Sequence, residues 1–205
     1  MGSWKLKAAR LKLDALAHAE KLIGKKPFDD LSVVVLVEKL NITKVTFYKY
    51  FRRKQDILHY YFRVWCLRQT VELLKSPKEG LEGISFLSDK LSELYHIHPG
   101  IVRGWIYYSG SLSKKQASFV INKEEKKLLF PTIQGIEKMY APSFEEMITE
   151  FISQAIHRKE IPKGQVQDLT NRVIVVIYGS LMVAHVQPSA QVKDFCKRAW
   201  LTMLG

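Results

Sequence analysis

The most informative part of the sequence is residues 32–51, which read SVVVLVEKLNITKVTFYKYF. The β-branched run at 33–37 is locally typical of a buried strand. Apolar residues from Val33 to Leu40 also fit one helical stripe, however, and Ser32 suits the N-cap position. A lone strand in an otherwise helical chain would have no pairing partner, so we predict a short helix here.

A second short helix is predicted directly after the first. Asn41 tolerates the left-handed backbone of a tight turn between helices, and Thr43 suits the N-cap of the helix that follows. Phe47 and Phe51 can face inward and hold this helix against its neighbours. Two short helices joined in this way are typical of a helix-turn-helix, whose second helix enters the major groove of DNA.

The outer side of the second helix offers the chemistry for this task, with hydroxyl and ammonium groups from Thr43, Lys44, Thr46, Tyr48 and Lys49. Basic residues at 52–54 follow at once, where phosphate contacts are expected. The whole chain has a formal net charge of +12, and residues 1–75 carry +9 of it. Binding of an anionic partner is therefore assigned mostly to the first third of the chain.

Residues 41–58 resemble the recognition-helix signature of the tetracycline-repressor (TetR) family of bacterial transcriptional regulators. The residues that match this signature in identity or in kind are Ile42, Thr43, Thr46, Phe47, Tyr48, Phe51, Lys54, Ile57 and Leu58. The sequence departs from the family pattern at Asn41, which replaces a turn glycine, at Val45, which replaces a small residue, and at Tyr50, which replaces histidine.

The resemblance implies a set of DNA contacts. It implies phosphate contacts at Ser32, Tyr48 and Lys54, and positions facing the groove at Thr43, Lys44, Thr46 and Lys49. A basic arm is expected to add phosphate or minor-groove contacts, and it consists of Lys5, Lys7, Arg10 and Lys12. The implied partner is double-stranded DNA with a palindromic operator, bound by a homodimer without a cofactor.

Apolar spacing is helical almost throughout the chain, and breaks rich in proline and glycine separate the helical segments. We therefore predict an all-α fold. By the resemblance, residues 1–53 form a three-helix DNA-binding head that contains the helix-turn-helix. Residues 54–205 form a larger helical body for ligand binding and dimerisation. Within it, residues 54–75 are predicted to be a long, buried connecting helix.

Two apolar helices are predicted at 165–186 and 189–204, and the resemblance implies that they form a four-helix dimer interface. The sequence alone shows only that this apolar surface must be buried, so a monomeric core is the alternative.

Aromatic residues can line a cavity for a small apolar or aromatic effector, or simply fill a core. The candidates for ligand binding are Phe62, Trp65, Tyr95, Trp105, Tyr108 and Phe151. The resemblance implies a repressor that such an effector releases from DNA by shifting the connecting helix.

Other classes of protein are disfavoured. Motifs of phosphate loops, serine hydrolases and zinc proteases are missing from the sequence, so an enzyme is not predicted. His96 and His98 point to different faces of a helix, and we predict no metal site. Cys66 and Cys196 have no metal or redox spacing and are predicted to be reduced thiols of a cytoplasmic protein. The apolar run 173–186 is shorter than the ~18 residues of a membrane span and is predicted to be a buried helix.

One alternative keeps the fold but changes the partner. Val34, Val35 and Val45 are apolar where a DNA-binding face is expected. They are the main support for a TetR-like helical module that acts through a protein partner without reading a specific operator.

Overall fold

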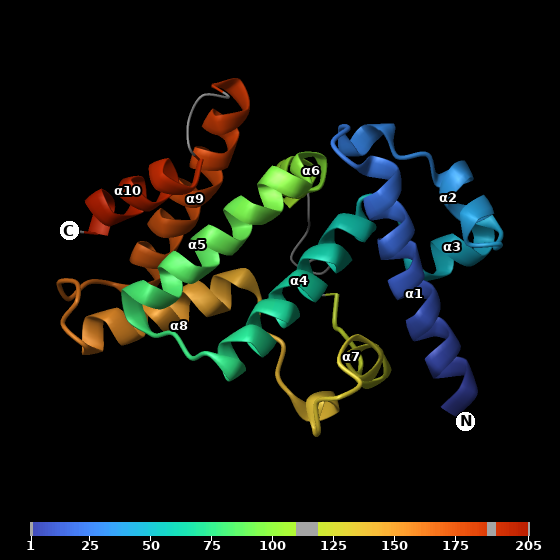
Figure 1. Cartoon of the computed structure of the whole chain (residues 1–205), viewed down its shortest axis with the longest axis horizontal. Helices are drawn as coiled ribbons and strands as arrows, with labels where there is room; N and C mark the ends of the chain where they lie inside the picture. The colour runs from blue at the N-terminus through green and yellow to red at the C-terminus, as the bar shows by residue number, and fades with distance from the viewer. Residues whose placement is uncertain (1, 110–118, 188–191, 205) are drawn as a thin grey trace. The chain divides into compact units, whose positions relative to one another are not determined.

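The computed structural model describes residues 2–109, 119–187 and 192–204 (Figure 1), and in this part of the chain the regular elements are all helices. The predicted all-α fold is confirmed. Contacts between residues group the chain into two compact units, and the division falls inside helix α4 (Asp56–Lys75). Unit 1 comprises Met1–Trp65 and His98–Ala141, and unit 2 comprises Cys66–Ile97 and Pro142–Gly205. The functional division at residue 53 stays a prediction.

Unit 1 is built around the long helix α1. In chain order its elements are α1 (Gly2–Ile23), the 3₁₀ helix η1 (Phe28–Asp30), α2 (Val33–Lys39), α3 (Lys44–Tyr50), the first part of α4, α6 (Pro99–Ser109), α7 (Lys123–Leu129) and the 3₁₀ helix η2 (Ile136–Lys138). Helix α1 packs against α2, α6 and α7. Its buried side is lined mainly by alanines, at Ala9, Ala15 and Ala19, because small side chains let neighbouring helices approach closely.

Unit 2 contains the second part of α4 and the helices α5 (Gly80–Ile97), α8 (Phe144–His157), α9 (Val166–Val186) and α10 (Val192–Leu204). Helix α5 packs against α8, and α9 packs against both α8 and α10. Gly83 allows the first of these contacts, because a Cβ atom at this position would overlap the ring of Phe151. The close approach of α5 and α8 therefore needs glycine there.

Helix α9 is apolar on two sides but buried on one. By length and composition alone it is long and apolar enough to cross a membrane, and it is the one such helix among the described residues. One side is fully buried at Val173, Ile177 and Leu181. The other side leaves Val175 and Val186 largely exposed, at 69% and 78%. This second side is therefore not buried within the single chain, and its burial in a dimer interface stays a prediction.

Helix α4 covers most of the range 54–75 in which a connecting helix is predicted. It begins at Asp56, whose carboxylate accepts a hydrogen bond from the backbone N–H of Arg53 at 3.0 Å. Between Asp56 and Leu67 every side chain except that of Arg63 is buried. The helix is therefore surrounded by other side chains over its first three turns.

His59 makes the stability of the fold sensitive to acid. Burial is the main cause that lowers the pKa of His59 below its ordinary value of 6.5, and Arg53 lowers it further, while Asp56 acts in the opposite sense. Below pH 6.5 the unfolded chain therefore binds a proton that the folded chain does not, so the free energy of unfolding falls as the pH falls. We expect the drop in Tm between pH 7.5 and pH 5.5 to be smaller in a His59→Gln variant. Equal drops in thermal denaturation of both proteins would contradict this prediction.

Candidate DNA-binding interface

Helix α2 begins at a side-chain cap, as predicted. The hydroxyl of Ser32 lies 3.4 Å from the backbone N–H of Val35 and accepts from it. Leu36 and Val37 are buried, which fixes the helix against the rest of unit 1. The β-branched run at 33–37 is therefore helical, because burial of one stripe outweighs the local preference for a strand.

The turn between α2 and α3 depends on Asn41. Its φ is 51°, in the left-handed region, so the predicted backbone conformation is confirmed. Its N–H donates to the carbonyl of Glu38 at 3.1 Å, and the N–H of Ile42 donates to the carbonyl of Val37 at 3.0 Å. These two hydrogen bonds satisfy the last carbonyls of α2 and fix the angle at which the chain enters α3.

Helix α3 is capped and held from one side. The hydroxyl of Thr43 accepts from the backbone N–H of Thr46 at 3.1 Å and lies 3.0 Å from the hydroxyl of Thr46, so the two predicted groove-facing threonines bond to each other. Phe47 and Phe51 are fully buried, with ring centroids 5.3 Å apart. Phe51 in turn lies 5.9 Å from the ring of Tyr60 on α4. Two phenylalanine rings therefore anchor a helix of only seven residues.

The opposite side of α3 is exposed and basic. Its exposed residues are Lys44, Val45, Tyr48 and Lys49. Val45 and Lys49 are four positions apart and therefore lie one above the other, away from Phe47. In the described part of the chain neither Lys44 nor Lys49 forms an ion pair. Four of the predicted DNA-binding residues are thus on one short element, with the two lysines and Tyr48 pointing outward.

Lys54 has partners within unit 1. Its ammonium donates to the backbone carbonyl of Asp29 at 2.9 Å and lies 5.2 Å from the centroid of the Phe28 ring. The residue therefore joins η1 to the segment before α4. Its contact with a DNA phosphate remains a prediction. For this contact the ammonium group would have to bind the carbonyl of Asp29 and the phosphate at the same time.

The predicted basic arm is part of helix α1 rather than a separate tail. Lys5, Lys7 and Arg10 are exposed on the first turns of this helix. Lys12 instead lies 2.6 Å from the carboxylate of Glu125 on α7, and its side chain is only 14% exposed. The charge of Lys12 is therefore neutralised inside unit 1, and its predicted contact with DNA, which would require it to leave Glu125, stays a prediction.

Glu125 is the centre of a buried polar cluster that sequence reasoning missed. It is fully buried, and its carboxylate accepts from Lys12 and from both the backbone and the side-chain N–H groups of Asn122. The ammonium of Lys12 also lies 4.3 Å from the centroid of the Tyr60 ring. Burial and the nearby charge of Glu125 raise the pKa of Tyr60. The one available signal in the sequence was the spacing of Asn122 and Glu125, which is that of a capping box.

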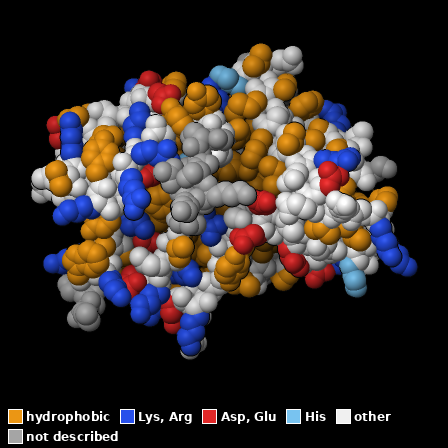
Figure 2. Space-filling view, turned by 180° about the vertical axis from the view of Figure 1, so that it is seen from behind, with side chains coloured by type: hydrophobic (Ala, Val, Ile, Leu, Met, Phe, Trp, Pro, Cys, Tyr) orange, Lys and Arg blue, Asp and Glu red, His pale blue; other side chains and the backbone are white. Residues whose placement is uncertain are grey.

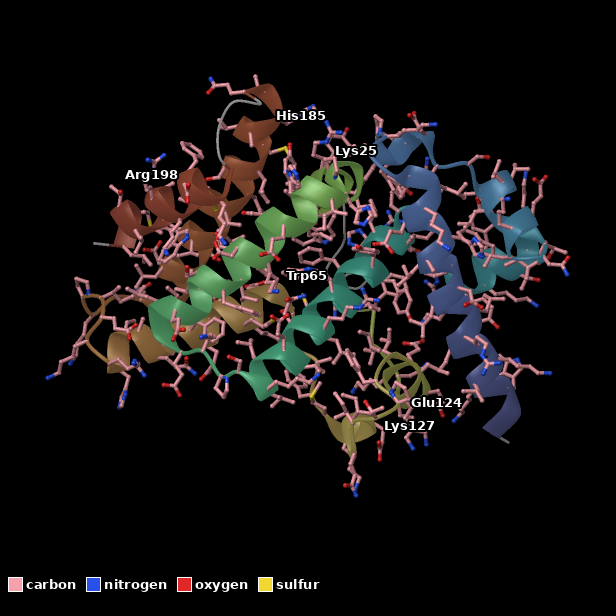
Figure 3. All side chains as sticks on the ribbon, in the orientation of Figure 1. Lys25, Trp65, Glu124, Lys127, His185 and Arg198 are labelled. Atoms are coloured by element: carbon pink, nitrogen blue, oxygen red, sulfur yellow. The ribbon has the colours of Figure 1, made fainter. Side chains whose placement is uncertain are left out.

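Four of the six predicted ligand-binding residues lie in unit 1. Phe62 stacks against Trp65 of the same helix (labelled in Figure 3) with centroids 5.0 Å apart, and against Trp105 of α6 at 3.5 Å. All three rings are buried. Tyr108 is held differently, because its hydroxyl donates to the carboxylate of Asp29 at 2.6 Å. These rings are packed against protein groups.

The other two candidates, Tyr95 and Phe151, are buried in unit 2. Phe151 packs on the backbone of α5 at Gly83. The structure therefore divides the six candidates between the two units, and their role in ligand binding stays a prediction. Among the described residues no group of three or more His, Cys, Asp or Glu side chains is arranged to hold a metal ion.

The surface of unit 1 mixes basic and hydrophobic side chains. On the face drawn in Figure 2, Lys and Arg side chains alternate with exposed hydrophobic ones over much of unit 1.

Comparison with known proteins gives one match to a family. Residues 15–61 match the family described as bacterial regulatory proteins, tetR family. No curated protein matches the sequence. Among solved structures, the chain is similar to the crystal structure of a gamma-butyrolactone receptor (ArpA-like protein), with 13% sequence identity, 97% of this chain and 87% of that chain covered, and a TM-score of 0.48. The helix-turn-helix at residues 32–51 lies within the match, so residues 15–61 carry the sequence pattern of the bacterial regulatory proteins of the tetR family.

Proposed function

We propose that this protein is a cytoplasmic, sequence-specific transcriptional regulator that binds a palindromic DNA operator as a homodimer. The observation that carries the proposal is the exposure of Lys44, Tyr48 and Lys49 on one side of α3. The other side of this helix is fixed to unit 1 by the buried rings of Phe47 and Phe51. A recognition helix needs this combination, because base contacts discriminate only when the side chains are presented in a fixed geometry.

The proposed contacts divide by chemistry. The ammonium groups of Lys44 and Lys49 can donate to guanine edges or to phosphates, and the hydroxyl of Tyr48 can donate to a phosphate. Ser32 already caps α2, and its exposed hydroxyl can donate to a phosphate at the same time. Thr43 and Thr46 are proposed to support the helix and to face the groove with their methyl groups.

A gel-shift experiment with matched lysine variants tests this proposal. We expect a discrete complex between the purified protein and DNA from upstream of its own gene, and we expect it to survive competitor DNA. Lys49→Ala should weaken this complex by about 1–3 kcal/mol when Lys49 meets a base edge. The control is Lys163→Ala, which removes an equal charge from an exposed loop of unit 2. Equal loss in both variants, or smeared binding that competitor removes, would contradict sequence-specific recognition by α3.

The proposed homodimer is supported by an exposed apolar stripe in unit 2. Val175, Val183 and Val186 are exposed along one side of α9, and Leu201 is exposed on α10. Apolar surface of this extent is expected to be covered in solution. We expect the wild-type protein to be a dimer and Val175→Glu to be a monomer in size-exclusion chromatography with light scattering. Thr132→Glu, on an exposed loop of unit 1, is the control. A monomeric wild type, or an unchanged dimer in Val175→Glu, would contradict the proposal.

We further propose that the protein represses transcription and that a small apolar or aromatic effector releases it from DNA. The support is the position of α4, which follows α3 after a short segment and carries Phe62 and Trp65. A ligand that favours another position of α4 would change the separation of the two recognition helices in a dimer. Because successive major grooves are about 34 Å apart, a shift of a few ångströms lowers affinity. In this proposal residues 1–53 act as the DNA-binding domain and residues 54–205 as the regulatory domain.

The second candidate function is a helical module that acts through a protein partner. It is favoured by the exposure of Val34, Val35 and Val45, which are 43%, 38% and 70% exposed. Such a protein would show weak DNA binding without sequence preference and would co-purify with a protein. The lysines on either side of Val45 favour DNA, because an apolar protein surface would have to desolvate both charges.

A further inference from the structure

We propose that Val45 reads the DNA sequence by contacting the C5-methyl group of a thymine in the major groove. Each half of the operator would then carry a thymine at the base pair that faces Val45. This inference rests on the proposed function, and it specifies what the same interface recognises.

The direction of the Val45 side chain is the first step. Phe47 is fully buried and marks the inner side of α3. Val45 lies two residues earlier, which turns its side chain by about 200° around the helix axis, to the opposite side. At 70% it is the most exposed of the large hydrophobic side chains between residues 32 and 51. Any binding mode that inserts the outer side of α3 into the groove brings Val45 to the base edges.

The chemistry of valine selects its partner. Its side chain has no polar atom, and the one apolar group on the base edges in the major groove is the methyl of thymine. Opposite any other base, Val45 would cover a donor or acceptor without replacing its hydrogen bond to water, which is unfavourable. A β-branched residue in a helix has a strongly preferred χ1 rotamer, so Val45 loses little freedom when it makes this contact.

The residues next to Val45 leave its side chain available to contact a base edge. The hydroxyls of Thr43 and Thr46 lie 3.0 Å from each other, so both are already engaged near the start of the helix. Lys44 and Lys49 are exposed beside Val45 and can hold the helix on the backbone or on guanine edges. An apolar residue between two such cations fits DNA, where a methyl group lies among phosphates and polar base edges.

Deoxyuridine substitution tests the inference directly. The wild-type full-length protein would first select its preferred sequence from a pool of random double-stranded DNA. Each thymine of the selected half-site would then be replaced by deoxyuridine, which removes the methyl group and keeps every hydrogen-bonding atom. At the thymine that faces Val45 we expect affinity to fall about fourfold, the value of one buried methyl group. A thymine that faces the methyl group of Thr43 or Thr46 would keep its penalty in a Val45 variant.

Two valine variants show whether Val45 causes the loss of affinity at the substituted thymine. In Val45→Ala the penalty at that thymine should fall below twofold, whereas Val35→Ala, which shortens an exposed valine of α2, should keep it. A selected sequence without a thymine that is sensitive to deoxyuridine would overturn the inference, and so would an unchanged penalty in Val45→Ala. Failure of the pool to yield any preferred sequence would overturn the proposed function as well.

Discussion

Replacing Lys12 by methionine is expected to lower the free energy of unfolding of unit 1 by about 3–5 kcal/mol, the cost of leaving a buried charge without its partner. The carboxylate of Glu125 is fully buried, and without Lys12 it would keep the hydrogen bonds from Asn122 but lose its cationic partner. The interaction joins residues 113 positions apart, so its loss should loosen α7 from α1. Urea unfolding followed by circular dichroism measures the change.

Two further variants identify the buried charge as the cause. In Lys12→Met combined with Glu125→Gln the uncompensated charge is absent, and we expect most of the lost stability to return. Lys7→Met removes an exposed lysine from the same helix and should have almost no effect. A loss below about 1 kcal/mol in Lys12→Met would show that the pair contributes little to holding unit 1 together.

Replacing Phe47 by alanine is expected to cost about 3–5 kcal/mol and to abolish DNA binding. The Phe47 ring is fully buried, and its centroid lies 5.3 Å from that of Phe51 and 5.2 Å from that of Tyr48. A helix as short as α3 is not stable by itself, so it depends on this packing. Without the ring, the exposed residues would no longer be presented in one geometry. Urea unfolding and a gel-shift on the same samples measure both effects.

Tyr48→Phe is the control for Phe47→Ala, because we expect it to lower the affinity for DNA without lowering the stability of the fold. Tyr48 is 44% exposed, so removal of its hydroxyl should leave the free energy of unfolding nearly unchanged. Affinity for the operator should still fall, because the proposed phosphate contact is lost. Stable folding and full DNA binding in Phe47→Ala would contradict the view that buried aromatics position the recognition helix.

The local structure of the helix-turn-helix could be predicted because its determinants are close together in the sequence. Ser32 and Thr43 cap helices that begin one residue later, and Asn41 adopts the left-handed backbone within the turn. Caps and turns depend on hydrogen bonds that span three to five residues, and such bonds follow from residue types and spacing.

Interactions between distant residues could not be predicted in the same way. Lys12 is one of several basic residues near the N-terminus, and its partner Glu125 lies in a charged run that is typical of a solvated helix face. Lys54 is likewise bound to Asp29, which precedes it by 25 residues. Which lysine faces solvent and which is paired is decided by how helices pack, and single-sequence patterns carry little information about that.

The division of the chain also depends on distant contacts. The sequence resemblance separates residues 1–53 from the rest, whereas the contacts in unit 1 add residues 98–141 to this segment. The reason lies in α1, which packs against both α6 and α7. The predicted ligand-binding residues are divided in the same way. Trp105 on α6 lies beside Phe62 in unit 1, whereas Phe151 on α8 belongs to unit 2.

The most direct test of the central claim is the ratio of two affinities. Fluorescence anisotropy would compare labelled DNA from upstream of the gene with a shuffled sequence of the same length and composition, at 50 mM and at 200 mM salt. Recognition through α3 predicts binding to the upstream DNA that is tighter by a factor on the order of 10³ or more at the higher salt. Equal affinities that fall together as salt increases would mean that only the charge of the chain attracts DNA, and would contradict the account.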